Sequence, residues 1–384
     1  MTEFSVCFES SIANIGSQDW QLLFKNNGPF TQYQFLHALE SSGSVGKGTG
    51  WMPQHIVVKV GDIIVAAMPN YLKQHSYGEY MFDWNIANAY HQNHIEYYPK
   101  FVSAVPFTPA TSKRIAISEE YKVIAEQIVN AIISACDKVL TQVNGSNCQW
   151  LFLDNETSNL LASAGTLQRY ELQYHWLNKG YDSFAAFCQS MVSRKRKNIL
   201  KERRKVAAQG FDFVWLTGSE VTKQQWQRFY EFYQLTYLKR SGHNGYLTSE
   251  FFQTIGQHSN DNVLLFFALN EQKQEVAASL FFKDNHTLYG RYWGCEQEYD
   301  FLHFETCYYQ GIEYCIKNNL QRFDAGAQGE HKLKRGFEPV LCFGNYLIRD
   351  KRFKTMLKDY FAQERQHFQQ LKNDSVKMLP FKSK

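Results

Sequence analysis

Side chains that could bind an anion crowd one short turn near the C-terminal end of the chain. The turn follows a predicted strand over 322–325 and contains glycines at 326 and 329. Turn glycines expose backbone N–H groups, and neighbouring cations add positive charge, so this stretch could cradle an anion. A solvated turn without a role fits the composition equally well. The candidate binding residues here are Gln328, Glu330, Lys332, Lys334 and Arg335, with His331 among them.

A basic segment is the second candidate site. From Arg194 to Lys205 there are eight basic residues and one acid, a local charge of +7, whereas the whole chain carries only +4. The rest of the chain is therefore net acidic, and a polyanion should meet the protein at this segment. Charges surround the predicted helix, which suits contact with nucleic-acid phosphates rather than base reading; a solvated basic helix is the alternative. The candidate residues are Arg194, Lys195, Arg196, Lys197, Lys201, Arg203 and Arg204.

Two runs in the N-terminal half mix aromatic and ionisable residues, over 71–84 and 97–109. Both are too polar for a core and too aromatic for a plain linker, so they could line a substrate groove. Rigid loops that pack against the body of the protein are the alternative. The candidate substrate-binding residues are Lys73, His75, Glu79, Tyr80, Asp83, Tyr98 and Lys100.

Both halves of the chain predict the same order of elements to position these residues. An amphipathic helix and a short buried strand recur, over 119–139 and 150–153 and again over 303–317 and 322–325. We interpret this as a structural duplication, with a border near Gly180 and domains over 1–180 and 181–384. Each half should be a mixed sheet flanked by helices, an α/β class fold, and the basic helix over 184–208 should open the second half.

Composition excludes several classes of protein. The longest apolar runs are far too short to span a bilayer, and the first residues lack the features of a secretion signal. Eight cysteines contain no CxxC pair, which argues against a structural zinc site and a disulfide framework, so we expect reduced thiols in the cytoplasm. No Ser-His-Asp spacing or metal-ligand cluster stands out, and the oligomeric state stays open.

Local sequence phrases resemble the FemAB-like family, whose members are described as peptidoglycan biosynthesis or recognition proteins. The resemblance covers nearly the whole chain in order. It implies two tandem GNAT-like modules of mixed α/β structure, with a substrate groove between them. The phrases lie at Trp51–His55, Tyr71–Tyr80, Tyr98–Lys100, Pro106–Pro109, Arg194–Ile199, Leu302–Glu305 and Gly326–Lys332.

The resemblance implies an acyltransferase that moves an aminoacyl or other acyl group onto an amine of a peptide or cell-wall precursor. The donor would be aminoacyl-tRNA, which makes tRNA a partner, or acyl-CoA. The glycine-bearing loop that grips CoA pyrophosphate in GNAT enzymes has no counterpart at Cys295–Phe304. By resemblance, Lys334 and Arg335 would face a negative group of the substrate.

Acyl transfer to an amine needs a proton acceptor and donors for the oxyanion. Glu305, His303 and His331 are the candidate catalytic residues, although a Glu in the first turn of a helix is often only a dipole partner. A non-catalytic module that recognises glycan, peptide or nucleic acid remains the alternative function.

Overall fold

The computed structural model describes residues 3–258, 260–327 and 329–382. Contacts divide the chain into two compact units: unit 1 comprises Met1–Glu171 and Leu341–Gln370, and unit 2 comprises Leu172–Val340 and Leu371–Lys384. The sequence predicts a border near residue 180, with residues 341–370 in the second domain. They belong with unit 1 because β15 (Glu338–Ile348) pairs there with β8 (Asn147–Leu153) and Glu364 binds Arg169.

Unit 1 contains two groups of strands packed around α4 (Ala125–Gln142). One sheet has the order β1-β3-β4-β7, and a second run has the order β2-β5-β6-β8. Strand β6 is parallel to β8, and α4 connects them. The strands are β1 (Ser5–Glu9), β2 (Trp51–Pro53), β3 (His55–Val60), β4 (Ile63–Met68), β5 (Tyr71–Lys73), β6 (Lys100–Ser103) and β7 (Ala116–Ile117); the other helices are α1 (Ser17–Phe24), α2 (Tyr33–Ser41), α3 (Trp84–Gln92) and α5 (Asn155–Ser163), with α12 (Lys351–Lys377) starting in this unit.

The predicted apolar stripe explains how α4 covers the sheet. Ile128, Ile132, Cys136 and Leu140 recur every fourth residue, so they lie on one face of the helix. All four are fully buried in a core that includes residues of β3, β4, β6 and β8. Burial of this stripe fixes the crossover between the two parallel strands.

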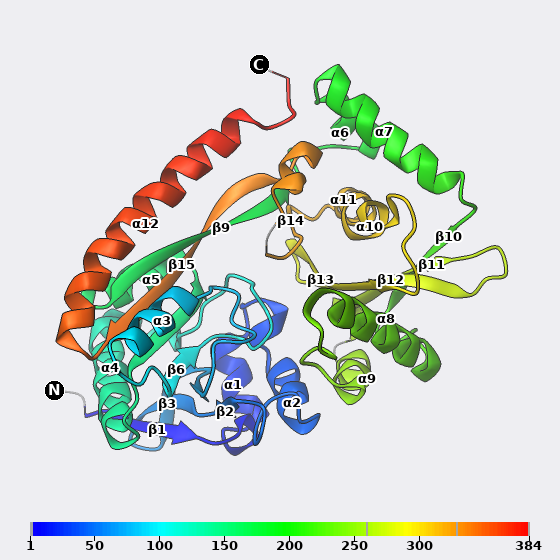
Figure 1. The fold of residues 1–384 in the computed structure, drawn as a ribbon. Coiled ribbons are helices and arrows are strands. Elements are labelled where there is room, and N and C mark those ends of the chain that lie inside the picture. The colour runs from blue at the N-terminus through cyan, green and yellow to red at the C-terminus, as the bar shows by residue number, and fades with distance from the viewer. Residues whose placement is uncertain (1–2, 259, 328, 383–384) are drawn as a thin grey trace. The chain divides into compact units, whose positions relative to one another are not determined.

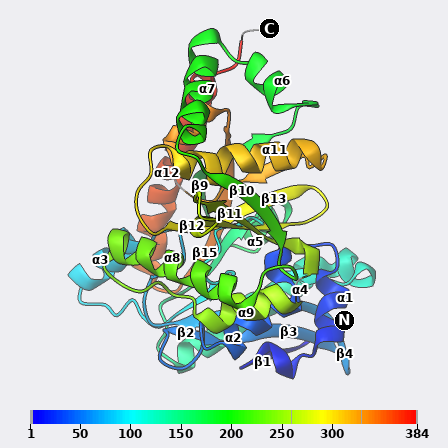
Figure 2. The ribbon, with the colours of Figure 1, turned by 90° about the vertical axis from the view of Figure 1, so that its right-hand side faces the viewer.

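Unit 2 is built on strands in the order β10-β11-β12-β13-β14-β9. Helices α8 and α9 lie on one face of strands β11 to β13, and α10 and α11 lie on the other (Figures 1 and 2). The strands are β9 (Leu167–Leu177), β10 (Asp212–Thr217), β11 (Val263–Leu269), β12 (Glu275–Lys283), β13 (Thr287–Cys295) and β14 (Arg322–Asp324); the helices are α6 (Phe184–Gln189), α7 (Ser193–Ala207), α8 (Lys223–Ser241), α9 (Ser249–His258), α10 (Leu302–Phe304) and α11 (Gln310–Lys317).

The same strand–helix–strand motif occurs in unit 1 and in unit 2, as the sequence predicts. In unit 2, β13 and β14 are parallel and are connected through α10, a π-helical turn at Glu305–Tyr309, and α11. This matches the parallel pair β6 and β8 around α4 in unit 1. The predicted mixed α/β class with a structural duplication is therefore confirmed.

The basic helix predicted over 184–208 is two helices, α6 and α7, with a break at residues 190–192. The C-terminal segment occupies the break: the Val192 N–H donates to Pro380 O (2.9 Å), and the Lys382 N–H donates to Ser190 O (3.0 Å). These long-range hydrogen bonds compete with the helical ones at this position. A local sequence pattern could not predict them.

Candidate functional site

The segment 71–84 of unit 1 buries charged side chains and exposes several aromatic ones. Lys73, Glu79 and Asp83 are at most 2% exposed, whereas Tyr77 is 54% exposed and Trp84 is 41% exposed. Strand β5 places Lys73 opposite Lys100 of β6 in the antiparallel register. The loop after β5 then folds back over these two lysines, and it does so through the left-handed residues Gly78 (φ 79°) and Tyr80 (φ 63°).

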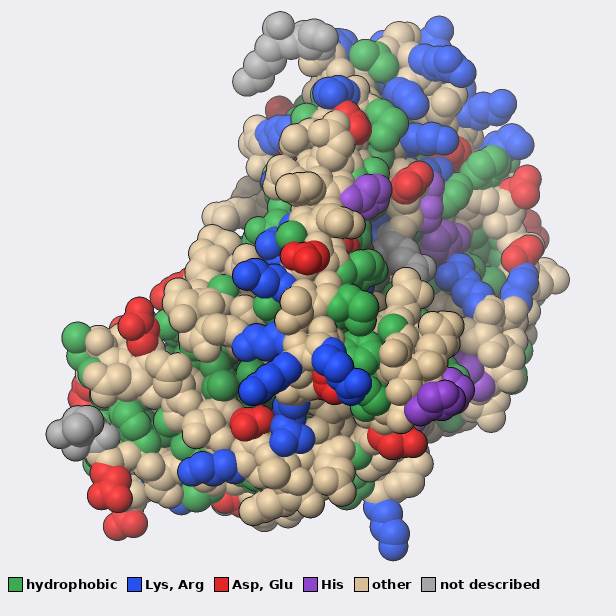
Figure 3. All heavy atoms as spheres, turned by 60° about the vertical axis from the view of Figure 1, so that its left-hand side comes forward, with side chains coloured by type: hydrophobic (Ala, Val, Ile, Leu, Met, Phe, Trp, Pro, Cys, Tyr) green, Lys and Arg blue, Asp and Glu red, His purple; other side chains and the backbone are tan. Residues whose placement is uncertain are grey.

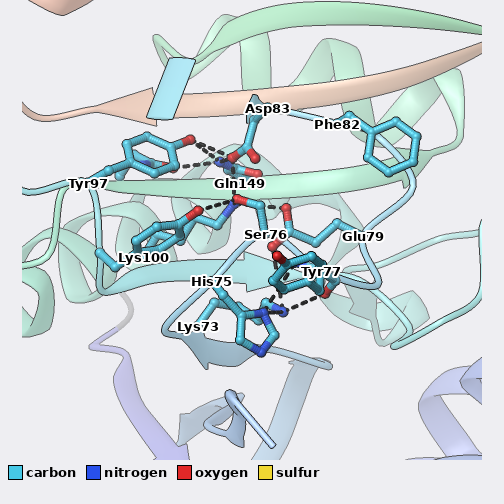
Figure 4. A network of polar contacts seen from close by, with 12 residues as sticks. Lys73, His75, Ser76, Tyr77, Glu79, Phe82, Asp83, Tyr97, Lys100 and Gln149 are labelled. Carbon is cyan, nitrogen blue, oxygen red and sulfur yellow. Dashed lines mark hydrogen bonds and ion pairs between the residues drawn. The ribbon is translucent and has the colours of Figure 1, made fainter. Parts of the chain in front are cut away.

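Lys100 is the centre of the resulting buried network, which Figure 4 shows from close by. Its Nζ donates to Ser76 Oγ (3.1 Å), Glu79 Oε2 (2.8 Å) and Asp83 Oδ2 (2.5 Å), and its side chain is fully buried. Burial opposes the charge on Lys100, but the two carboxylates outweigh it and raise the lysine pKa above its ordinary value. Lys100 is therefore a permanent cation.

Asp83 is the permanent anion of the network. Its Oδ2 also accepts hydrogen bonds from Tyr97 Oη (2.5 Å) and Gln149 Nε2 (2.7 Å). Burial would raise the Asp83 pKa, but the charge of Lys100 and the hydrogen bond from Gln149 lower it to about 2. Its other oxygen, Oδ1, has no hydrogen-bond partner among the described residues.

Lys73 and Glu79 form a different kind of pair, because burial shifts each pKa toward neutrality. Lys73 Nζ lies 3.7 Å from Glu79 Oε1, beyond hydrogen-bond distance, and 3.5 Å from the centre of the Trp51 ring. Burial lowers the Lys73 pKa to about 7, assisted by the charge of Lys100. Burial also raises the Glu79 pKa to about 7, assisted by Asp83 and opposed by Lys100. The pair can therefore gain or lose a proton near neutral pH.

Two partly exposed side chains connect this network to the surface. Tyr98 Oη lies 2.7 Å from Ser76 Oγ, which accepts from Lys100. His75 Nδ1 lies 3.4 Å from Lys73 Nζ, and its Nε2 lies 3.0 Å from Thr49 O. Burial and the charge of Lys73 lower the His75 pKa, so the ring is neutral at pH 7.

Glycine is required beside His75. A Cβ on Gly50 would lie 2.2 Å from His75 Nε2, and the Gly50 φ of +72° is itself unfavourable for other residues. The glycine-rich stretch at 41–50 thus makes room for the imidazole ring.

The buried pair predicts a pH dependence of stability. The ordinary glutamate pKa is 4.5, and the folded-state pKa of Glu79 is about 7, so the folded protein keeps a proton that the unfolded chain has lost. The stability from this proton is present below the unfolded pKa and disappears as pH rises through the folded one. Relative to Glu79→Gln, the wild-type free energy of unfolding should fall between about pH 5 and pH 8. Urea denaturation across that range checks this, and a pH-independent difference would contradict it.

Most of the second aromatic run, predicted to be too polar for a core, is in fact buried. Residues 101–110 are buried without exception, and Lys100 and Tyr97 at its start belong to the network. The prediction was wrong about burial because hydrogen bonds among the polar groups satisfy them inside the protein. Tyr80 is partly buried, and its ring lies 6.4 Å from that of Phe82.

In unit 2 the predicted base Glu305 is held in an ion pair. Arg203 donates from Nε and Nη2 to both Glu305 oxygens at 2.8–3.1 Å, and it also binds Glu313. Gln310 Nε2 donates to Glu305 Oε1 as well (2.8 Å). Glu305 is 3% exposed. This geometry favours a role in attaching α7 to the helix 302–317 over a role as a free base.

Loss of Arg203 should therefore destabilise the protein, because Glu305 would be left buried without its cation. We expect Arg203→Met to lower the free energy of unfolding by about 2 kcal/mol, less than for a fully buried pair because Arg203 is partly exposed. Arg204→Met, at the exposed neighbouring position, should change it by less than about 0.5 kcal/mol. Urea denaturation measures the stability of both variants. Equal stabilities would contradict the structural role of Arg203.

The other predicted residues of unit 2 lie in separate environments. The His303 ring packs edge-on against Trp293 at 4.8 Å, and burial lowers the His303 pKa to about 3. His331 is exposed, and its Nε2 lies 2.9 Å from Tyr308 Oη. Lys332 is buried and donates to Ala325 O (2.9 Å) and Gly326 O (2.7 Å).

Arg335 is a second buried cation of the predicted anion cradle, but Glu202 already binds it. Its Nη2 donates to both Glu202 oxygens at 2.9–3.0 Å, and its guanidinium lies 3.6 Å from the centre of the Phe304 ring. Glu330 and Lys334 are exposed. Gln328 lies outside the described residues.

Sequence reasoning missed a buried charged group between β13 and β14. Asp324 Oδ2 accepts from Arg291 Nη2 (2.8 Å), Asp324 Oδ1 accepts from the Gly326 N–H (2.8 Å), and His175 lies 3.7 Å away. Burial lowers the His175 pKa to about 4, so this imidazole is neutral at pH 7. An aspartate inside a predicted buried strand was the available signal. Gln149, inside the apolar strand β8, was the corresponding signal in unit 1.

Most cations of α7 face solvent. Arg194, Lys197, Lys201 and Arg204 are exposed, and Lys195 and Arg196 are partly exposed. Arg203 differs because its guanidinium is bound to the two glutamates. The predicted anion-binding set thus divides into one structural residue and an exposed group.

Within the described ranges, no group of three or more His, Cys, Asp and Glu side chains could hold a metal ion, and no disulfide joins any of the cysteines. Across the same ranges, no helix combines the length and apolar character needed to cross a membrane.

Comparisons with known proteins agree with this architecture. A family model described as FemAB-like, peptidoglycan biosynthesis/recognition, matches residues 11–383. No curated protein matches the chain. Among solved structures, FemX is similar with a TM-score of 0.51 and 11% identity, over 93% of this chain and 100% of that one.

Two further structures are similar over most of their length. A C-terminal DUF2156 domain from Agrobacterium fabrum, named after lysylphosphatidylglycerol synthetase, has a TM-score of 0.53 and 8% identity over 92% of this chain and 97% of that one. A tandem GNAT protein from the clavulanic acid biosynthesis pathway has a TM-score of 0.48 and 9% identity over 90% of this chain and 98% of that one. The fold is a mixed α/β fold of two tandem GNAT-like units.

Proposed function

Because the chain belongs to the FemAB-like family of peptidoglycan biosynthesis/recognition proteins, we propose that it is an acyltransferase. In this proposal it transfers an acyl or aminoacyl group to an amine of a cell-wall precursor, a peptide or a related acceptor. FemX and the synthetase-named domain share its fold. The donor is an aminoacyl-tRNA or an acyl-CoA.

The buried pair of Lys73 and Glu79 is the observation that carries this proposal. Ionisable groups with strongly shifted pKa values are concentrated at functional sites, although structural ion pairs also show such shifts. Asp83 and Lys100 form a hydrogen-bonded ion pair, which a structural role explains. Lys73 and Glu79 are held apart at 3.7 Å, and each has a pKa near 7. A general base works best when its pKa is near the operating pH.

The pair would handle the proton of the acceptor amine. The amine nitrogen attacks the carbonyl carbon of the donor, a C–N bond forms, and the bond to the leaving oxygen or sulfur breaks. Lys100 Nζ gives one of its protons to Glu79 Oε2 (2.8 Å) and receives one from Ser76 Oγ (3.1 Å), and the amine proton replaces that one through Tyr98 Oη (2.7 Å), so Lys100 is a cation before and after the transfer. A proton returns to the leaving group, so the network ends as it began.

The geometry does not favour the unit 2 candidates for this step. Arg203 holds Glu305, and His303 is buried with a pKa of about 3. His331 is exposed, and Tyr308 contacts it. We therefore assign the proton transfer to residues of unit 1. The Arg335–Glu202 and Arg291–Asp324 ion pairs of unit 2 have a structural role in this proposal.

The test is a search for turnover. The pure protein is incubated with charged tRNA or acyl-CoA and with candidate amines, including amino sugars and peptides with a free lysine. Mass spectrometry then looks for an acylated amine. The proposal expects product with at least one donor class. Binding of acceptor without product from any donor would instead support a non-catalytic recognition module.

A further inference from the structure

We infer that unit 2 carries a docking surface for an anionic lipid bilayer, formed by the exposed face of α7 and the C-terminal segment beside it. We call it the basic–apolar surface. Its cations are Arg194, Lys197, Lys201, Arg204 and Lys205, and its apolar members are Val192, Leu200, Val376 and Met378. None of these residues belongs to the proposed site of unit 1, so the inference stands apart from the proposed function.

The cations form a stripe along one side of α7. Arg194, Lys197, Lys201 and Arg204 are three or four residues apart, which places them on one face of a helix over roughly 15 Å. The buried residues Ile199 and Val206 lie on the packed side. Figure 3 shows Lys and Arg side chains gathered at the top of the molecule, where α7 lies.

The protein does not neutralise this stripe. Among the described residues, no carboxylate forms an ion pair with Arg194, Lys197, Lys201 or Arg204. Glu202, the single acid of α7, points to Arg335 and accepts from it at 2.9–3.0 Å. Arg203 is likewise bound to Glu305 and Glu313. The charges that remain on the exposed face therefore all have the same sign.

Exposed apolar side chains lie on α7 and on the C-terminal segment. Leu200, between Lys197 and Lys201 on the stripe, is 41% exposed, and Val192 at the start of α7 is 40% exposed. Met378 is 57% exposed and Val376 is 50% exposed. The hydrogen bond from Val192 N–H to Pro380 O (2.9 Å) holds this C-terminal segment against the start of α7.

This combination favours a bilayer over a nucleic acid. A nucleic acid takes its phosphates to the cations and gains little from exposed aliphatic side chains. A helix at a membrane surface uses both features, since cations attract anionic headgroups and apolar side chains enter the boundary with the acyl chains. The aliphatic residues therefore distinguish the two partners.

The test is co-sedimentation of the full-length protein with vesicles. Vesicles of phosphatidylcholine alone are compared with equal mixtures of phosphatidylcholine and phosphatidylglycerol, at low and high salt. The expected result is binding to the anionic vesicles that high salt weakens. The triple variant Lys197→Glu, Lys201→Glu, Arg204→Glu should bind at least tenfold less, and so should Leu200→Ser with Met378→Ser.

A matched control has the same charge change at the same spacing on another exposed helix. Lys351, Lys354 and Lys358 of α12 are exposed and likewise three and four residues apart. Reversing them to Glu should leave vesicle binding at the wild-type level. An equal loss in this control would overturn the inference, because net charge and not the surface would then explain binding.

Nucleic acid is the competing partner. The membrane inference would be overturned if the wild type bound unfractionated tRNA but not anionic vesicles, and the α7 triple variant no longer bound the tRNA. The Leu200→Ser, Met378→Ser variant separates the cases, because a tRNA surface should tolerate it. Unfolding temperatures equal to wild type confirm that each variant is folded.

Discussion

Lys100→Met should lower the free energy of unfolding by about 3–5 kcal/mol, because it leaves two buried carboxylates without their cation. Lys100 Nζ binds Glu79 Oε2 and Asp83 Oδ2, and all three side chains are shielded from solvent. Methionine fills a similar volume but cannot donate a hydrogen bond. Urea denaturation at neutral pH measures the loss.

Two further variants separate charge from packing in this experiment. Lys122→Met removes a lysine whose partner Glu119 is 85% exposed, and it should change stability by less than about 0.5 kcal/mol. Asp83→Asn introduced with Lys100→Met should restore part of the loss, because one of the uncompensated charges disappears. A Lys100→Met protein as stable as wild type would contradict the buried network.

Glu79→Gln should reduce acyl transfer by about 10²–10⁴-fold, the usual contribution of a general base. Glutamine keeps the size of the side chain but cannot take up a proton. The loss should appear in kcat rather than in KM, because the buried Glu79 does not contact a substrate in the ground state. The measurement is the initial rate of product formation for the donor and acceptor found by mass spectrometry.

Glu120→Gln is the matched control, because Glu120 is exposed and distant in sequence from the network. It should transfer at the wild-type rate. If Glu79→Gln is folded and also retains the wild-type rate, Glu79 is not the proton acceptor.

Sequence periodicity predicted much of the fold. The stripe on α4 and the matching pattern over 303–317 identified the two crossover helices, and the short strands after them pair in parallel with β6 and β13. Periodicity works here because burial of one helix face is a local consequence of residue spacing. The border between the units was harder to predict from the sequence, since β15 belongs to unit 1 through contacts between residues far apart in sequence.

The candidate residues of unit 1 were predicted in part. Composition singled out Lys73, Glu79, Asp83 and Lys100, and the structure brings these four together. Composition could not show that these four residues are buried while Tyr77 and Trp84 are exposed, because the loop 74–83 has no periodic pattern. Strand register places Lys100 opposite Lys73, and residue types alone do not fix a register.

For the candidate residues of unit 2, the sequence indicated suitable chemistry but could not reveal their binding partners. Glu305 has the right chemistry for a base, but Arg203 lies 102 positions earlier in the chain and binds it. Arg335 has the right charge for an anion cradle, but Glu202 lies 133 positions earlier. A sequence gives the type of each group and not the partner that tertiary packing supplies.

The most direct measurement is an infrared titration of the wild type and Glu79→Gln. Difference spectra between pH 5 and pH 9 report the carbonyl band of a protonated carboxylic acid. Burial raises the Glu79 pKa to about 7, so the wild type should show a band that disappears with a midpoint near neutral pH and is missing from Glu79→Gln. Identical spectra from the two proteins, with every carboxyl group already ionised at about pH 6, would contradict the account.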